Sequence, residues 1–187
     1  MDKQKVDKRV LLTKNLLKSA LIQLMRESHI SKISVRSLCE TANINRSTFY
    51  AHYNDSYDLL NTLEEEVLEN IKRDLKTQDF SENQPVSSQV LSRILYYVKE
   101  NSELFQALLS ENCDFAFQRD ILLLAQIITS QITQSPDSRI QEYLEEFGIT
   151  GCVSVVQKWL QDGMIESPTK LAGFLLQVLY NGITSFQ

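Results

Sequence analysis

Apolar side chains recur along most of the chain at intervals of three and four residues, which is the period of an amphipathic α-helix. In the first such run, residues 8–28, Leu17, Leu21 and Leu24 share one face and lysines and arginines lie on the other. No stretch alternates with the period of a strand, and glycine and proline are few, at 5 and 3 of 187 residues. The pattern predicts an all-α fold.

Two short helices are predicted after this run. Ser34 is a good N-cap for the first of them. Asn43 suits a tight reversal, because asparagine adopts the left-handed conformation more readily than most residues. Asn45 can then cap the next helix, whose packing face carries Phe49 and Tyr53. Two short helices joined by such a turn are typical of a helix-turn-helix that places its second helix in the major groove of DNA.

The remainder of the chain is also predicted to be helical. Asp55 caps a long helix over residues 55–76, and the polar segment 77–88 is the one substantial loop. Further helices are predicted near residues 88–101, 102–110, 114–134, 139–162 and 169–186.

Charge is distributed unevenly along the chain. Residues 1–53 carry ten Lys or Arg and four Asp or Glu, a net +6, while the remainder carries 9 basic and 20 acidic residues, a net −11. The basic part suggests a polyanionic partner, although a solvated basic helix without a partner has the same charge. We predict an N-terminal three-helix DNA-binding domain over residues 1–54 and a larger helical ligand-binding and dimerisation domain over 55–187, with helix 55–76 as connector.

Candidate catalytic and metal-binding chemistry is sparse. Cys39, Cys113 and Cys152 are far apart and lack partners at metal-ligand spacing, so buried thiols are expected. His29 and His52 both lie in the basic part, which leaves the larger domain without the usual general base. The sequence predicts no enzyme, no catalytic residue, no metal and no cofactor.

Neither a membrane span nor a secretory signal is predicted. The most apolar window, residues 121–128, is far shorter than the roughly 20 residues that span a bilayer. Residues 1–9 are charged and lead directly into an amphipathic pattern. We expect a cytoplasmic protein with no membrane partner.

The outer face of the third helix carries the candidates for reading DNA. Arg46 can pair with N7 and O6 of guanine, and Ser47 and Thr48 are short enough to let the helix approach the base edges. Tyr50 and His52 lie further along, where they can donate to phosphate oxygens. The first three are expected to specify the sequence and the last two to position the helix.

The segment Ile44–Tyr53 resembles the recognition-helix region of TetR/AcrR-type transcriptional regulators, and the similarity extends over about residues 16–60. Ser34-Val35-Arg36 matches the start of the second helix of this family, so the resemblance also assigns DNA contacts there. The candidate DNA-binding residues are Ser34, Arg36, Asn45, Arg46, Ser47, Thr48, Tyr50, His52 and Tyr53.

Two positions depart from the family pattern. The family commonly has glycine where Asn43 stands, and a phosphate-contacting lysine where Ser56 stands, which weakens one expected backbone contact. The C-terminal region looks like that of a TetR-type subgroup frequent in Firmicutes. The residues that carry this second likeness are Gly151, Trp159-Leu160, Gly163 and Ser167-Pro168.

Helices 139–162 and 169–186 are apolar nearly all round, so both sides of each must be covered. Pairing them with their copies across a two-fold axis would form a four-helix bundle, which the TetR resemblance also implies. Burial of both helices in a monomer is the alternative. The expected dimer interface consists of Phe147, Gly151, Val155, Trp159, Phe174, Val178 and Phe186.

The resemblance further implies a small-molecule effector in the C-terminal domain, with helix 55–76 as the lever to the DNA-binding domain. Aromatic residues of the helices that would line such a pocket are the candidate contacts, although aromatics at helical spacing are more often core. They are Tyr96, Tyr97, Phe105, Phe115 and Phe117.

These features predict a homodimeric, sequence-specific regulator of transcription. We expect a repressor that binds double-stranded DNA at a near-palindromic operator and is released by a small-molecule effector. The rival hypothesis is a helical protein-interaction adaptor or ligand-binding protein that does not use its DNA-binding domain. An enzyme ranks third.

Overall fold

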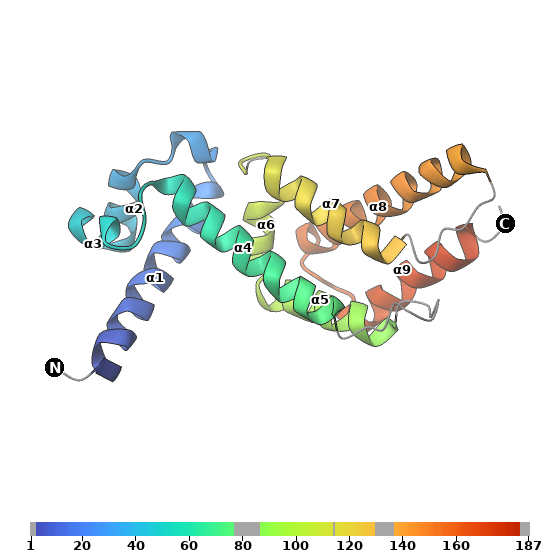
Figure 1. Cartoon of the computed structure of the whole chain (residues 1–187), viewed down its shortest axis with the longest axis horizontal. Helices are drawn as coiled ribbons and strands as arrows, with labels where there is room; N and C mark the ends of the chain where they lie inside the picture. The colour runs from blue at the N-terminus through green and yellow to red at the C-terminus, as the bar shows by residue number, and fades with distance from the viewer. Residues whose placement is uncertain (1–2, 77–86, 114, 130–136, 184–187) are drawn as a thin grey trace. The chain divides into compact units, whose positions relative to one another are not determined.

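The computed structural model describes residues 3–76, 87–113, 115–129 and 137–183, and these form helices joined by turns (Figure 1). The prediction of an all-α fold is confirmed. Most of the predicted loop 77–88 and Phe186 lie outside the described residues. The helices are α1 (Lys3–Met25), the 3-10 helix η1 (Ile30–Lys32), α2 (Val35–Ala42), α3 (Arg46–Tyr50), α4 (Ser56–Leu75), α5 (Ser88–Glu100), α6 (Ser102–Leu108), α7 (Phe115–Thr129), α8 (Ser138–Gln161) and α9 (Pro168–Ile183).

The chain divides into two compact units. The head unit consists of Met1–Val67 and Ala107–Asp114, and the body unit consists of Leu68–Gln106 and Phe115–Gln187. One boundary therefore falls inside α4. The predicted domain boundary after residue 54 stays a prediction, because a compact unit need not coincide with a functional domain.

In the head unit, α2 packs against α1 and α3. Their shared core includes Leu17, Leu21, Leu38 and Phe49, all fully buried. Between α2 and α3, Asn43 has φ 53° and ψ 47°, which is the left-handed conformation predicted for it. The reversal thus turns the chain without a glycine.

The turn from α3 into α4 is held by carboxylate groups. Asp55 Oδ1 accepts the Asp58 N–H at 2.8 Å, which confirms Asp55 as a cap. Asp58 Oδ2 in turn accepts the backbone and side-chain N–H groups of Asn54 at 2.8 and 2.7 Å. These bonds fix Asn54, four residues after the end of α3, to the first turn of α4.

The segment between α6 and α7 belongs to the head unit and bonds to the corner that precedes α2. The Ile30 N–H donates to the Asn112 carbonyl at 2.9 Å. The Asn112 side-chain amide donates to the Met25 carbonyl, at the end of α1, at 2.8 Å. Cys113 Sγ contacts Glu64 Oε1 at 3.5 Å. Residues distant in sequence therefore fix the position of this corner.

In the body unit, α5 packs along α9 and α7 packs along α8. The corner between α8 and α9 is built from the residues that carried the C-terminal family likeness. Gly163 has φ 80°, and the Trp159 indole N–H donates to the Glu166 carbonyl at 3.0 Å. Ser167 Oγ accepts a backbone N–H of the next helix, and Pro168 is its first residue. The likeness in sequence therefore marks a helix–helix corner.

Of the three cysteines, Cys39 and Cys113 are buried, as predicted, and Cys152 is partly exposed. Burial raises the pKa of the Cys39 thiol, and it raises the pKa of the Cys152 thiol to about 11. Because the thiolate is the reactive form, these groups are poor nucleophiles at neutral pH.

We expect Cys152 in the folded protein to react with iodoacetamide at pH 8 about a hundredfold more slowly than in the urea-unfolded chain. With a pKa of about 11, only about a thousandth of this thiol is ionised at pH 8. Peptide mass spectrometry after timed quenching measures the rate. Equal rates in the folded and unfolded chain would contradict the burial of this thiol.

We expect Asn112→Ala to destabilise the protein by about 1 kcal/mol, because the Met25 carbonyl loses its side-chain donor. Urea unfolding at a fixed protein concentration measures the change. Asn15→Ala is the matched control, since Asn15 is exposed on α1. If the two variants unfold at the same urea concentration, the Asn112 bond does not hold the corner.

Candidate nucleic-acid interface

The structure exposes most of the side chains that the sequence assigned to DNA. Thr48 and His52 are half-buried, and Tyr53 is buried. The exposed members of the set are Ser34, Arg36, Asn45, Arg46, Ser47 and Tyr50.

An open groove of about 420 Å³ runs between α2 and α3. It brings together Arg36 from α2, Asn45 from the turn and Arg46 from α3, three of the predicted DNA-binding residues. Two guanidinium groups from different helices thus line one concave surface, where they can act on the same stretch of a polyanion. The full lining is Arg36, Cys39, Glu40, Asn43, Ile44, Asn45 and Arg46.

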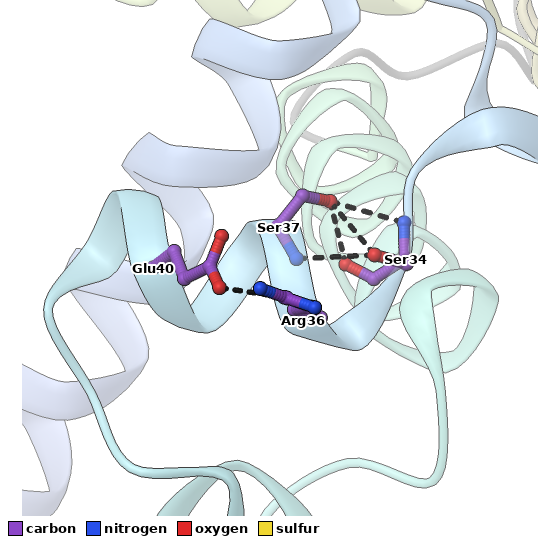
Figure 2. Close-up of polar contacts among 4 residues, drawn as sticks. All are labelled: Ser34, Arg36, Ser37 and Glu40. Atoms are coloured by element: carbon purple, nitrogen blue, oxygen red, sulfur yellow. Dashed lines mark hydrogen bonds and ion pairs between the residues drawn. The ribbon is translucent and has the colours of Figure 1, made fainter.

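Glu40 is the one carboxylate that lines this groove, and it was not among the predicted DNA-binding residues. Arg36 Nε donates to Glu40 Oε1 at 2.7 Å, one helical turn along α2 (Figure 2). This hydrogen bond and the negative charge of Glu40 raise the pKa of Arg36 above its ordinary value. The i,i+4 spacing was the signal that could have found the pair in the sequence.

Ser34 is the N-cap of α2, as predicted. Ser34 Oγ accepts the Ser37 N–H at 3.1 Å, while Ser37 Oγ accepts the Ser34 N–H at 3.1 Å and donates to the Ser34 carbonyl at 2.8 Å (Figure 2). This reciprocal box satisfies backbone donors at the start of the helix. Ser34 therefore acts as a structural cap, and its Oγ also lies 3.2 Å from Ser37 Oγ, within hydrogen-bond distance.

Asn45 occupies the N-cap position of α3, but its side chain makes no capping hydrogen bond. The prediction of its position is confirmed, and the predicted capping bond is absent. Because the residue is exposed and lines the groove beside Arg46, its amide is open to solvent at the start of the recognition helix. An asparagine amide can form paired hydrogen bonds with adenine.

Tyr50 and Tyr53 differ in exposure, although both are candidate DNA-binding residues. Tyr50 is 59% exposed and contacts Phe49 edge-on, with ring centres 5.6 Å apart. Tyr53 is 4% exposed, its ring packs against Phe49, and its hydroxyl is buried without a hydrogen-bond partner among the described residues. Burial raises the pKa of Tyr53. We therefore remove Tyr53 from the set, because its ring faces the core.

The aromatic residues predicted to line a ligand pocket are only partly brought together. Phe105 and Phe117 are buried core residues. Tyr97 is half-buried, its ring lies edge-on to Phe105 at 5.7 Å, and its hydroxyl accepts from the Asn70 amide at 3.0 Å. Tyr96 is exposed, away from this cluster. Phe115 begins α7, and its side chain lies outside the described residues.

A second open groove, of about 350 Å³, lies between α7 and α8. It contains none of the predicted pocket aromatics. Its lining combines apolar side chains with three glutamates and one arginine, so it is an amphipathic surface with a net negative charge. The lining residues are Arg119, Leu122, Leu123, Gln126, Glu142, Glu145, Glu146 and Ile149.

The predicted dimer residues are divided between surface and core. Phe147 on α8 is 70% exposed, and Phe174 and Val178 on α9 are also exposed, whereas Gly151 and Val155 are of intermediate exposure. Trp159 is buried at 4% exposure and bonds within its own chain, so we remove it from the proposed interface. Two further exposed apolar residues of α8, which were not among the predicted interface residues, lie one and two turns before Phe147. They are Tyr143 and Ile140.

Comparison with known protein families decides between a regulator and an unrelated helical protein. A TetR-type family model, described as a transcriptional regulator C-terminal region, matches residues 86–181, which is more than half of the 187-residue chain. The chain belongs to the TetR family of transcriptional regulators. The match includes the α8–α9 corner, whereas the likeness seen in the sequence was strongest over residues 16–60.

Solved structures of transcriptional regulators share the fold over nearly the whole chain. A TetR transcriptional regulator from Streptococcus agalactiae 2603V has a TM-score of 0.67 and 22% identity, covering 95% of this chain and 99% of that one. The dihydroxyacetone kinase operon activator DhaS has a TM-score of 0.59 and 19% identity, with coverage of 95% and 99%. FadR from Bacillus subtilis, solved in complex with stearoyl-CoA, has a TM-score of 0.60 and 16% identity, with coverage of 90% and 98%.

The comparison with curated protein sequences gives no match. Within the described part of the chain, no helix is both long and apolar enough to cross a membrane. The same residues contain no group of three or more His, Cys, Asp or Glu side chains placed to hold a metal ion.

We expect Arg46→Ala and Tyr50→Phe to weaken DNA binding in different ways. Arg46→Ala removes an arginine that can read guanine, so the free energy of DNA binding becomes less favourable by about 1 to 3 kcal/mol and the base preference at one position is relaxed. Loss of the Tyr50 hydroxyl removes a phosphate donor and weakens binding about equally on all sequences. Fluorescence anisotropy on the preferred duplex and its single-base variants measures both effects. A base-selective loss in Tyr50→Phe would reverse the assigned roles.

Proposed function

We propose that this TetR-family regulator is a homodimeric repressor that binds a near-palindromic operator through the α2–α3 surface and is released by a small-molecule effector. The observation that carries the proposal is the exposed groove where Arg36, Asn45 and Arg46 come together. Bidentate arginine and asparagine side chains are the groups that discriminate base edges in the major groove.

The charge distribution supports an approach to DNA through residues 1–53, the part of the head unit that contains α1, α2 and α3. Residues 1–53 carry a net charge of +6, whereas the rest of the chain carries −11. A polyanion attracts the first part and repels the second, which favours one docking orientation. Since the attraction depends on displaced counterions, the affinity falls steeply with salt.

The exposed apolar side chains of α8 and α9 support the homodimer. Tyr143 and Phe147 lie four residues apart on α8, and Phe174 and Val178 lie four residues apart on α9. Each pair therefore shares one helical face. Apolar faces of this kind are commonly covered by a partner, and a two-fold axis covers each with its own copy. Two recognition helices about 34 Å apart would then address successive major grooves.

Communication with an effector would use α4, the predicted lever, which runs from the head unit into the body unit, together with the segment between α6 and α7. Asn112 bonds to the corner before α2, and the chain continues from it directly into α7 of the body unit. A ligand that binds one arrangement of the body unit more tightly would favour that arrangement. The segment that holds Asn112 would then transmit the change to the corner before α2. The FadR structure with stearoyl-CoA supports small-molecule binding in a protein of this fold.

In this proposal the protein is not an enzyme, needs no cofactor or metal, and acts in the cytoplasm, where the DNA is. The competing function is a helical adaptor whose head unit is not used on DNA. Two features favour this alternative: Glu40 places a negative charge in the groove, and buried Ser56 stands where the family commonly has a phosphate-contacting lysine.

Capture of genomic fragments by the purified full-length protein, at near-physiological salt, tests the proposal. We expect a few loci to be strongly enriched, each protected over an inverted repeat. Titration of small-molecule extracts into the captured complex then identifies release by an effector. Retention of all fragments in proportion to their abundance, or of none, would favour the adaptor.

We expect Phe147→Glu to convert the dimer into monomers, because it places a charge on the exposed apolar face of α8. Sedimentation velocity measures the mass. Tyr96→Glu is the matched control, since it introduces the same charge at an exposed aromatic of α5, and this variant should stay dimeric. A dimer that persists in Phe147→Glu would place the interface elsewhere.

A further inference from the structure

We propose that Glu40 is a positioning residue that holds the Arg36 guanidinium for reading a base edge and prevents it from acting as a general phosphate contact. The inference rests on the proposed DNA-binding function and deepens it. It concerns two side chains of α2 that line the same groove (Figure 2).

The geometry of the pair leaves part of the arginine available. The contact with Glu40 Oε1 engages Nε at 2.7 Å, and no hydrogen bond from Nη1 or Nη2 to the protein is found among the described residues. These two nitrogens carry the donors that pair with O6 and N7 of guanine. Glu40 therefore restrains the side chain without occupying those donors.

Restraint before binding favours recognition. A free arginine side chain loses conformational freedom when it docks on a base, and this loss opposes binding. A side chain already held by a neighbour loses less, so more of the hydrogen-bond energy contributes to affinity. The benefit is largest on a base that matches the fixed direction of the donors.

Charge gives the pair its selectivity. The two side chains are 71% and 64% exposed, so both face solvent and an approaching duplex. Together they carry no net charge, which means that the pair adds little to the attraction for phosphates. The free Nη donors can still bind a base edge. The charge of Glu40 thereby lowers the affinity for DNA of incorrect sequence, while its restraint of Arg36 favours the matching base, and the contrast between correct and incorrect sequences rises.

A purely structural role is a poor explanation of the pair. An exposed i,i+4 ion pair contributes little to stability. The start of α2 is already fixed by the reciprocal Ser34 and Ser37 hydrogen bonds (Figure 2). Substitutions of Glu40 should therefore leave the helix folded, and their effect on DNA can be measured separately.

The experiment selects bound duplexes from a random pool with the full-length dimer, at two salt concentrations. Glu40→Ala removes both the charge and the acceptor, whereas Glu40→Gln removes the charge and keeps an oxygen that Arg36 Nε can bond. We expect both variants to bind random DNA several-fold more tightly at low salt. Base preference at one position of each half-site should be lost in Glu40→Ala and partly retained in Glu40→Gln.

The same substitution in an Arg36→Ala background shows whether Glu40 acts through Arg36. We expect Arg36→Ala to lose the preference at that same position, and the double variant Arg36→Ala/Glu40→Ala to lose no more. Glu27→Ala is the matched control, because it removes one exposed carboxylate from the head unit outside the groove, and its base preference should stay intact. Thermal unfolding of every variant confirms that it is folded.

Three outcomes would overturn the inference. Unchanged preference in Glu40→Ala means that Glu40 does not position Arg36. A further loss of preference in the double variant means that Glu40 contacts a base itself, as a carboxylate does with the amino group of cytosine. If the unsubstituted protein enriches no sequence, the proposed function fails together with this inference. If it enriches a sequence and Glu40→Ala enriches the same one, only the inference is rejected.

Discussion

The proposed recognition helix α3 has only five residues, Arg46–Tyr50, and a helix of this length does not persist in water by itself. Its position depends on Phe49, which is fully buried in the head unit, and on the left-handed Asn43 that turns the chain into it. With Phe49 packed in the core, Arg46, Ser47 and Tyr50 are exposed on α3. The presentation of the proposed DNA-reading surface thus depends on the burial of one aromatic ring.

Local chemistry made several features of this surface predictable. The caps at Ser34 and Asp55 and the reversal at Asn43 depend on side chains within four residues of the backbone they stabilise. The four-residue spacing of Arg46 and Tyr50 likewise indicates that the two share a side of α3, and both are exposed. For these residues the sequence carries nearly all of the information.

Features that depend on distant residues could not be predicted in this way. Periodicity indicates which side chains share a face, but not which neighbour covers that face, and so Trp159 was assigned to an interface although it packs within its own chain. The bond between Asn112 and the end of α1 joins residues far apart in sequence. Tyr53 is a mixed case, because its four-residue spacing from Phe49 indicated the core while family likeness indicated DNA.

The protein carries two surfaces of different chemistry: a polar, arginine-bearing groove on the head unit and apolar faces on α8 and α9 of the body unit. In the proposed function, two copies of the chain present two recognition helices to one operator. The most direct test measures the affinity of the dimer for duplexes whose two half-sites are separated by five additional base pairs, or by ten. We predict that five additional base pairs abolish tight binding, because they add about half a helical turn and move one half-site to the opposite side of the duplex. Equal affinity for every spacing would contradict paired recognition by a symmetric dimer.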